Sequence, residues 1–239
     1  ETATVQAAAD EGYTFAGWYN AAGERVSSSA EYSFAVTASV ALTAHFSAEE
    51  ENVSNFTDVQ TDDWYAEAVA YAVENGLFTG TSDTTFSPGG TMTRGMLVTV
   101  LYRQAGEPEA SNHNKFVDVS ADIWYARAVT WAYDNGIVNG TGDKTFSPEE
   151  PVTREQIATI LMRYSDKMGM DVPETTSGDL SVFDDGDQVS SFALEGMRWA
   201  VAAQLINGNE RNELNPQGNA TRAECATILM RWSESGLEQ

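Results

Sequence analysis

The fold is decided by one stretch of the chain, from Phe116 to Arg163, which reads FVDVSADIWYARAVTWAYDNGIVNGTGDKTFSPEEPVTREQIATILMR. Its pattern recurs at residues 56–103 and 183–231. Each copy contains an aromatic residue near its start, which is Trp64, Trp124 or Phe192. A glycine follows it after 16 residues, a proline after eight more, an arginine after six more and a second arginine after nine more. Identical spacing in three copies indicates tandem repeats.

Each repeat is predicted to form a helix, a loop and a second helix. Trp64, Ala68, Tyr71 and Ala72 are spaced as one face of a helix. First helices are therefore expected over Trp64–Asn75, Trp124–Asn135 and Phe192–Gln204, with Gly76 and Gly136 ending the first two. Second helices are expected to begin at the N-caps Thr93, Thr153 and Thr221, with capping boxes that use Gln156 and Glu224.

Residues 1–50 have a different character, because runs such as Tyr13–Trp18 and Val40–Phe46 are typical of β-strands separated by turns. We predict a mainly α chain preceded by a small antiparallel β domain with a thin core. The expected domains are residues 1–48 for the β domain, 49–55 for an acidic linker, and 56–110, 111–170 and 171–239 for the three repeats.

The composition excludes several classes of function. The chain has 13 Lys and Arg against 36 Asp and Glu, a net charge of −23, so binding to nucleic acid or to an anionic membrane is not expected. It has no apolar run long enough to span a membrane. One cysteine, Cys225, and two histidines, His45 and His113, do not supply a zinc site or a Cys–His nucleophile, so no metal or cofactor is predicted. Cys225 is expected to be buried. The chain begins at Glu1, which we interpret as a fragment or a mature chain.

The arginine after each threonine N-cap is the main candidate binding residue. Arg94, Arg154 and Arg222 are at the first helical position, where the helix dipole disfavours a cation by roughly 0.3–1 kcal/mol. An anionic partner is therefore expected. One alternative is an aspartate of a neighbouring repeat, such as Asp58, Asp118 or Asp185. The other is an acidic ligand, held by the guanidinium and by free helix N–H groups.

Other repeated residues have mainly structural interpretations. Arg103, Arg163 and Arg231 are in the last turns of helices, where a cation suits the dipole. Asp83 and Asp143 are typical turn residues and do not complete a calcium loop. Trp64 and Trp124 are compatible either with core packing or with a flat surface for a sugar ring. The candidate ligand-binding residues are Arg94, Arg154, Arg222, Trp64, Trp124, Asp58, Asp118, Gly80 and Gly140.

The quoted motifs resemble the S-layer homology (SLH) domain, in three copies over residues 55–239. The family's Thr-Arg-Ala-Glu motif is complete at residues 221–224, partial at 153–156, and reduced to Thr and Arg at 93–94. The resemblance implies a pseudo-threefold helical unit with binding grooves between repeats. It also implies non-covalent anchoring of a bacterial surface protein to acidic, pyruvylated secondary cell-wall polysaccharide. The third repeat departs from the pattern with Phe192 and with residues 207–211.

Residues 1–48 resemble the internalin B-repeat group, through residues 12–19 and 42–46, which implies a spacer. The expected location is the extracellular surface, in the cell wall or S-layer, and the expected partner is an acidic glycan. A structural alternative is self-association in a surface layer, with the repeated arginines in inter-repeat ion pairs. An enzymatic alternative, a glycan hydrolase that uses Asp62/Asp63 or Asp184/Asp185, is disfavoured because adjacent carboxylates are usually solvated, so no catalytic residue is predicted.

Overall fold

The structure is a computed structural model of the 239-residue chain and describes residues 2–10, 13–48, 56–111, 113–170 and 178–235. Its internal contacts divide the chain into two units, residues 1–53 and 54–239. The predicted acidic linker, residues 49–55, lies outside the described residues.

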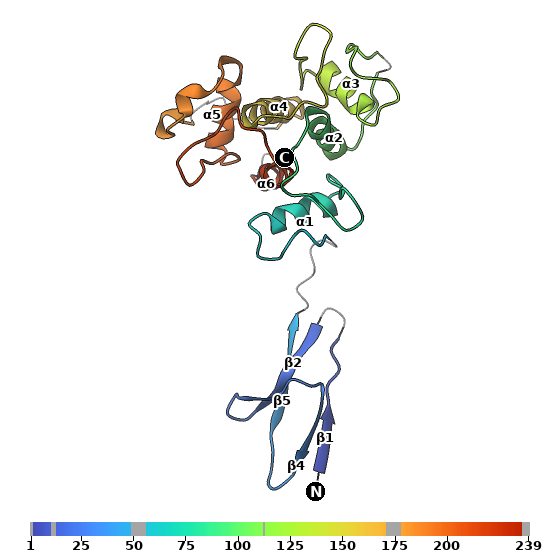
Figure 1. The fold of residues 1–239 in the computed structure, drawn as a ribbon, viewed down its shortest axis with the longest axis vertical. Helices are drawn as coiled ribbons and strands as arrows, with labels where there is room; N and C mark the ends of the chain where they lie inside the picture. The colour runs from blue at the N-terminus through green and yellow to red at the C-terminus, as the bar shows by residue number, and fades with distance from the viewer. Residues whose placement is uncertain (1, 11–12, 49–55, 112, 171–177, 236–239) are drawn as a thin grey trace. The chain divides into compact units, whose positions relative to one another are not determined.

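The first unit is a small antiparallel β structure, as predicted (Figure 1). Strand β1 (Thr2–Gln6) pairs with β4 (Glu31–Ala35), and β2 (Tyr13–Asn20) pairs with both β3 (Arg25–Ser27) and β5 (Leu42–Ala48). Trp18 is the large apolar side chain that this unit buries, and its indole N–H donates to the carbonyl oxygen of Ala30 at 3.2 Å. The core is thin because each sheet has two or three strands.

The second unit is helical and consists of the three repeats. Repeat 1 contains α1 (Ala66–Glu74) and α2 (Arg94–Gln104), and repeat 2 contains α3 (Ala126–Asp134) and α4 (Arg154–Lys167). In repeat 3, the short 3₁₀ helices η1 (Leu180–Val182), η2 (Gly186–Gln188) and η3 (Ser191–Ala193) precede α5 (Leu194–Ala202) and α6 (Arg222–Glu234). No helix in the described part of the chain has the length and apolar character that crossing a membrane requires.

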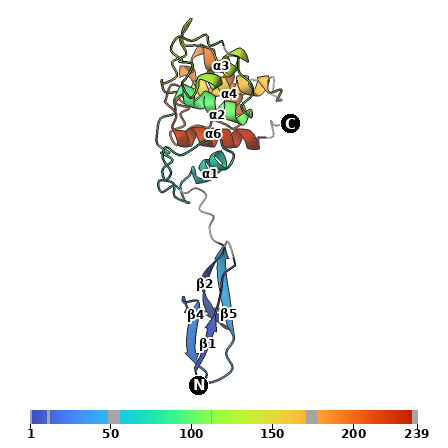
Figure 2. The same cartoon turned by 90° about the vertical axis from the view of Figure 1, so that its right-hand side faces the viewer.

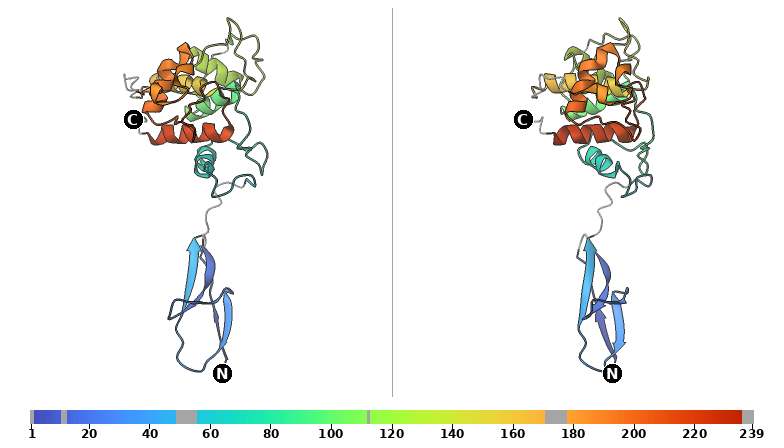
Figure 3. Two further views of the ribbon diagram at one scale, coloured as in Figure 1. Left: turned by 60° about the vertical axis from the view of Figure 1, so that its left-hand side comes forward. Right: turned by 90° about the vertical axis from the view of Figure 1, so that its left-hand side faces the viewer.

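The repeats close into a ring. The second helix of each repeat packs against the first helix of the next: α2 on α3, α4 on α5, and α6 back on α1. In Figure 1, α2, α4 and α6 surround the centre of this unit, and α1, α3 and α5 lie outside them. Figures 2 and 3 show α6 beside α1, which joins the last repeat to the first.

Three backbone hydrogen bonds form a cycle between the repeats. The N–H of Met92 donates to the carbonyl of Ala220 (2.9 Å), that of Ala220 to Val152 (3.0 Å), and that of Val152 to Met92 (2.9 Å). All three residues are fully buried. Because each repeat donates once and accepts once, the cycle has the pseudo-threefold symmetry that the resemblance implied, and removing one repeat would leave buried backbone groups unpaired.

One aromatic cluster belongs to all three repeats. Tyr102 packs on Trp131, Trp131 on Tyr164, and Tyr164 on Trp232. The indole N–H of Trp232 donates to Ser165 Oγ at 2.8 Å, so the buried polar atom has a partner. Cys225 is buried as predicted. The repeats therefore share a core, as expected for units too small to bury both helix faces alone.

The first helices begin later than the sequence suggested. Trp64 and Trp124 precede α1 and α3 in turns, because the N–H groups of Ala66 and Ala126 donate to carbonyls three residues back. The ends follow the predicted mechanism: Gly76 and Gly136 have φ of +67° and +73°. Repeat 3 has no glycine there, and Gln204 itself adopts φ of +57°.

The second helices begin as predicted. Thr93, Thr153 and Thr221 are the N-caps, and each side-chain oxygen accepts from the N–H three residues on. A complete capping box forms at Thr221 and Glu224. The box predicted for Gln156 is wrong, because its side chain accepts instead from Arg94 of repeat 1.

Candidate functional site

In each repeat, one aspartate binds backbone N–H groups of the loop between the two helices. The Asp58 carboxylate accepts from the N–H groups of Phe86 and Ser87, both at 2.8 Å. Asp118 does the same for residues 146 and 147, and Asp185 for residues 214 and 215. The second residue of each pair has a positive φ of 50–60°, so the carboxylate stabilises an unfavourable backbone conformation.

One of our two alternatives paired these aspartates with the repeated arginines; among the described residues no direct ion pair joins them, although Asp118 attracts Arg94 and Asp58 attracts Arg222 electrostatically across the repeat boundary. Both oxygens of Asp58 and both of Asp118 bind backbone N–H groups of their own repeats. Their evident function is therefore to shape the loops that line the inter-repeat grooves.

Positions 80 and 140 accept only glycine, because neighbouring atoms lie too close to leave room for a side chain. A Cβ at Gly80 would lie 2.5 Å from the ring of Phe56, and one at Gly140 would lie 2.8 Å from the ring of Phe116. Neither distance is sterically allowed. The two glycines therefore let the loop cross an aromatic ring just after Thr79 and Asn139, whose carbonyl oxygens accept from arginines of other repeats.

The arginines at the helix starts reach across the repeat boundaries. Arg94 Nε donates to the carbonyl of Phe146 at 3.0 Å, and its two terminal nitrogens donate to Gln156 Oε1 and the carbonyl of Asn139. Arg154 repeats this pattern on Leu214, Glu224 and Asn207. Arg222 donates to Phe86 and Thr79. Arg94 and Arg222 are buried and lie over the Phe146 and Phe86 rings, and burial lowers the pKa of both guanidinium groups.

The helix N–H groups that we expected to be free are occupied. The N–H of Arg154 donates to the carbonyl of Gly218 at 3.0 Å, and that of Glu155 to Pro216 at 2.9 Å. The first two N–H groups of α2 and α6 are likewise bonded to the adjacent repeat's loop. The expectation that a ligand is held by the first two N–H groups of these helices is therefore wrong.

One groove, called groove A here, has a volume of about 420 Å³. Arg94 enters it from repeat 1, and Phe192, which is 55% exposed, enters it from repeat 3. Its floor comes from repeat 2, through residues 138–141 and one face of α4. It is lined by two arginines, Arg94 and Arg163, and by no acidic residue. Among the described residues, the Arg163 guanidinium has no hydrogen bond or ion pair.

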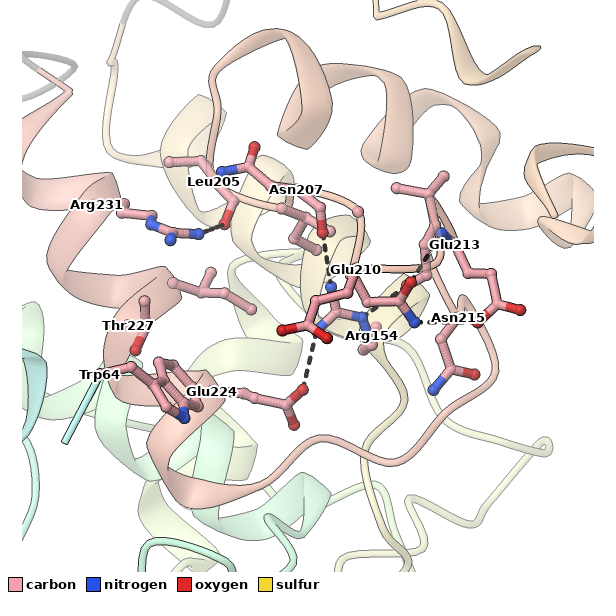
Figure 4. A pocket seen from close by; sticks show the side chains of 15 residues that line it. Trp64, Arg154, Leu205, Asn207, Glu210, Glu213, Asn215, Glu224, Thr227 and Arg231 are labelled. Carbon is pink, nitrogen blue, oxygen red and sulfur yellow. Dashed lines mark hydrogen bonds and ion pairs between the residues drawn. The ribbon is translucent and has the colours of Figure 1, made fainter. Parts of the chain in front are cut away.

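A second groove, called groove B here, has a volume of about 520 Å³ (Figure 4). It is lined by the equivalent positions of the repeats that follow around the ring. Arg154 comes from repeat 2, Trp64 from repeat 1, and the loop and α6 from repeat 3. In Figure 4 the Glu224 side chain lies between Trp64 and the Arg154 guanidinium. The two arginines of groove B, Arg154 and Arg231, are accompanied by three carboxylates, those of Glu210, Glu213 and Glu224.

The two grooves are lined by the same four positions of the second helix of a repeat. The sequence alone contains this spacing and could have indicated it. In groove A, residues 156, 159, 160 and 163 of α4 line the cavity, and in groove B residues 224, 227, 228 and 231 of α6 do so. This i, i+3, i+4, i+7 spacing defines one helix face. Arg163 and Arg231, which we interpreted as structural, therefore face the grooves.

Trp64 and Trp124 are not core residues. Trp64 is 66% exposed and lines groove B, whereas Trp124 is 57% exposed and lies in neither groove A nor groove B. Each exposed ring precedes the first helix of a repeat, and that helix packs on the second helix of the preceding repeat. This packing brings Phe192 and Trp64 to grooves whose floors belong to other repeats.

Comparison with known families agrees with this architecture. The S-layer homology domain matches residues 55–95, 115–158 and 182–226, which is more than half of the chain. The chain belongs to the S-layer homology family. Residues 1–50 match the divergent InlB B-repeat domain, in agreement with the predicted β-repeat. The SLH repeats make this chain an extracellular, cell-wall-associated anchoring segment.

Similar proteins include surface proteins and secreted enzymes. The Surface-layer 125 kDa protein of Lysinibacillus sphaericus is 32% identical over 84% of this chain and 17% of its own length. The Amylopullulanase of Thermoanaerobacterium thermosulfurigenes is 30% identical over 77% of this chain and 10% of its own. The Cellulosome-anchoring protein of Acetivibrio thermocellus is 28% identical over 63% of this chain and 34% of its own. The chain thus spans about a third of the length of these relatives or less, and the amylopullulanase matches it through its SLH region.

Proposed function

We propose that this SLH unit anchors its parent protein by binding an acidic, pyruvylated secondary cell-wall polysaccharide, and that groove A is the principal site. The observation that carries the proposal is the charge of this groove. Two guanidinium groups, Arg94 and Arg163, face a cavity that no carboxylate lines. A pyruvate ketal carries a carboxylate, which pairs with a guanidinium through charge-assisted hydrogen bonds.

The two arginines have different roles in this proposal. Arg94 is buried and already donates to three acceptors of repeat 2, so it positions the loop and contributes a fixed positive charge. Arg163 is half-buried and, within the described residues, has no partner of its own. It is therefore the group that is free to form a new contact with a carboxylate.

The remaining lining suits a sugar ring. Phe192 offers an exposed apolar face, and aromatic faces pack well against the C–H groups of a pyranose. A volume of about 420 Å³ is within the usual range for small-ligand sites, roughly 300–1,000 Å³. The net charge of −23 makes the exterior of the chain acidic. Because salt screens charges beyond a Debye length of about 8–10 Å, the groove arginines attract an anion only when it is close to the groove.

The test compares Arg163→Gln with Arg127→Gln in binding titrations with purified pyruvylated wall polysaccharide and with the same polymer after removal of the ketal. Arg127 is an exposed arginine of α3 outside both grooves, so both variants lose one positive charge. We expect Arg163→Gln to weaken binding about tenfold, the loss of one charge-assisted contact, and Arg127→Gln to leave it unchanged. Equal affinity for the two polymers would refute the role of the carboxylate.

The self-assembly alternative makes a different prediction. It assigned the repeated arginines to inter-repeat ion pairs, and in the described residues such a pair joins Arg154 to Glu224, whereas Arg94 and Arg222 bind neutral acceptors. If self-association is the function, light scattering will report a mass that rises with protein concentration in the absence of glycan. The anchoring proposal predicts a mass independent of concentration.

A further inference from the structure

We propose that Asn139 and Asn207 are sites of spontaneous deamidation, promoted by the arginine that reaches each of them from the preceding repeat. The backbone nitrogen of the following glycine loses its proton and attacks the side-chain carbonyl carbon Cγ. Ammonia leaves as a five-membered succinimide ring closes, and water then opens the ring to aspartate or isoaspartate. Asparagine is a thermolabile residue, and a following glycine hinders the attack least because it has no side chain.

Hydrogen bonds protect two of the four Asn-Gly pairs in the sequence, which are residues 75–76, 135–136, 139–140 and 207–208. The N–H of Gly136 donates to the carbonyl three residues back at 2.9 Å, and the Asn135 side-chain amide donates to the carbonyl four residues back at 2.8 Å. Gly76 and Asn75 make the same two bonds. Loss of the proton and rotation of the side chain would each break a bond, so both pairs should react slowly.

The other two pairs lack these restraints. Asn139 and Asn207 are exposed, and within the described residues neither side-chain amide makes a hydrogen bond. The N–H groups of Gly140 and Gly208 likewise have no acceptor in the described part of the chain. Both the attacking nitrogen and the carbon that it attacks are therefore available.

A guanidinium group contacts the reacting peptide bond at both sites. Arg94 Nη2 donates to the Asn139 carbonyl oxygen at 3.2 Å. Arg154 Nη2 donates to that of Asn207 at 3.4 Å (Figure 4). This carbonyl and the glycine N–H belong to one amide, so the negative charge left by the proton moves largely onto the oxygen, where a hydrogen-bonded cation stabilises it. Arg94 is buried, where charges interact more strongly, so Asn139 should react faster than Asn207.

The same contact directs the opening of the ring. The Asn139 carbonyl carbon becomes one of the two carbonyl carbons of the succinimide, and the Arg94 guanidinium makes it the more electrophilic. Attack of water there gives isoaspartate, and the new carboxylate forms from this carbonyl beside Arg94. Groove A, whose lining residues include no carboxylate, then acquires one. Deamidation would thus lower the affinity of an ageing protein for an acidic ligand, and this consequence alone rests on the proposed function.

The first experiment locates isoaspartate and aspartate by peptide mass spectrometry after incubation in mildly alkaline buffer. It compares the folded chain with the chain unfolded in urea, where the four pairs should react at similar rates because each has glycine next. In the folded chain we expect Asn139 to react at least about tenfold faster than Asn135, with Asn207 between them. Equal rates for Asn139 and Asn135 in the folded chain would overturn the proposal.

A variant of repeat 1 tests the guanidinium. Thr79 is exposed, its carbonyl accepts from Arg222 Nη2 at 2.7 Å, and the N–H of Gly80 has no acceptor among the described residues. Thr79→Asn creates an Asn-Gly pair under a closer guanidinium, so position 79 is expected to react at least as fast as Asn139. A rate no faster than that of Asn207 would show that the guanidinium does not promote the reaction.

Gly89→Asn is the matched control for a new Asn-Gly pair. Residue 89 is exposed and a Cβ there meets no atom within 4 Å, but the N–H of Gly90 donates to the carbonyl of Ser87 at 2.9 Å. We expect this pair to react as slowly as Asn135. A rate equal to that of position 79 in Thr79→Asn would mean that exposure alone decides which pairs react, and would overturn the proposal.

Binding after ageing separates the modification from its consequence. Asn139→Gln cannot close the five-membered ring, because its side chain is one methylene longer. Wild type is expected to lose affinity for the pyruvylated polymer as isoaspartate accumulates, and Asn139→Gln to keep its affinity. Isoaspartate at position 139 without loss of affinity would reject the consequence and leave the modification established, whereas absence of isoaspartate and aspartate at this position would reject the modification whatever the polymer does.

Discussion

Arg154 and Glu224 form an ion pair across the boundary between repeats 2 and 3, with 3.2 Å between Nη1 and Oε1. At the preceding boundary, Arg94 makes the same contact with Gln156 at 3.3 Å, so a neutral amide occupies the place of the carboxylate. Glu224 also accepts from the Thr221 N–H at 2.8 Å. One side chain therefore caps α6, joins two repeats and lines groove B.

Replacing Glu224 by Gln should remove the charge and keep the contact. Since Gln156 already serves this function for Arg94, we expect the fold to persist. The free energy of unfolding should fall by at most about 1 kcal/mol, because the pair is partly exposed and its Coulomb energy is screened. Urea unfolding at low and at high salt measures the change.

The salt comparison is the control for that variant. The wild-type free energy should decline slightly more with salt than that of Glu224→Gln, and the two should converge. A loss of several kcal/mol at all salt concentrations would show that the carboxylate is indispensable for the repeat boundary.

The loop aspartates should contribute to stability in the order of their burial. Asp185 is 8% exposed and satisfies two backbone N–H groups at 2.7 Å, so Asp185→Ala is expected to cost about 2–3 kcal/mol. Asp118 is exposed, and water can replace its carboxylate, so Asp118→Ala should cost less. Chemical denaturation of each variant gives these values.

Asp187 supplies the matched control, because it is exposed and lies two residues from Asp185. Asp187→Ala should change the free energy of unfolding by no more than about 0.5 kcal/mol. If Asp118→Ala proved more harmful than Asp185→Ala, burial would not be what sets the strength of these contacts.

Tyr125 should make stability fall in alkaline solution. Burial, together with the hydrogen bond that its hydroxyl donates to Glu149 (2.8 Å), raises the pKa of Tyr125 to about 12. The unfolded chain releases this proton near pH 10, whereas the folded chain keeps it to about pH 12. The contribution is complete below pH 10 and is lost as the pH rises from about 10 to about 12. Thermal melting across this range measures it.

Tyr125→Phe is the comparison for the alkaline melts. It lacks the ionisable hydroxyl and should show a shallower decline of melting temperature over the same window. Parallel curves for the variant and the wild type would mean that other groups cause the alkaline loss.

Cys225 should report on the cooperativity of the ring. Its thiol is buried in α6, and burial raises its pKa well above the ordinary value, so a thiol reagent reaches it only when α6 separates from the rest. Because the backbone cycle and the aromatic cluster involve all three repeats, we expect labelling to require global unfolding. Labelling rates with increasing urea should therefore follow the unfolding curve measured by fluorescence.

A truncated chain also tests whether the three repeats fold as one cooperative unit. Residues 56–110 alone lack the partners of α1 and of Met92, so this repeat should show no cooperative thermal transition by circular dichroism. A sharp transition, or rapid Cys225 labelling of the intact chain without denaturant, would contradict a single cooperative unit.

The sequence by itself determined the repeats, the helical periods, the threonine N-caps and the buried position of Cys225, because these depend on residues near one another in the chain. Spacing fixed where the second helix of each repeat begins, and Gly76 and Gly136 fixed where two of the first helices end. It also singled out Arg94, Arg154 and Arg222, since a cation at a helix N-terminus needs a compensating partner.

Only the tertiary structure decided what those partners are. Ring closure brings loop carbonyls of the next repeat to each arginine and occupies the helix N–H groups that the sequence left free. It also places Arg163 in groove A and Trp64 in groove B, so the expectation that Arg154 binds the acidic ligand and Arg163 does not is reversed in our proposal. The arginine contacts join residues 45 to 143 positions apart, and no local pattern specifies which distant groups a closed ring brings together.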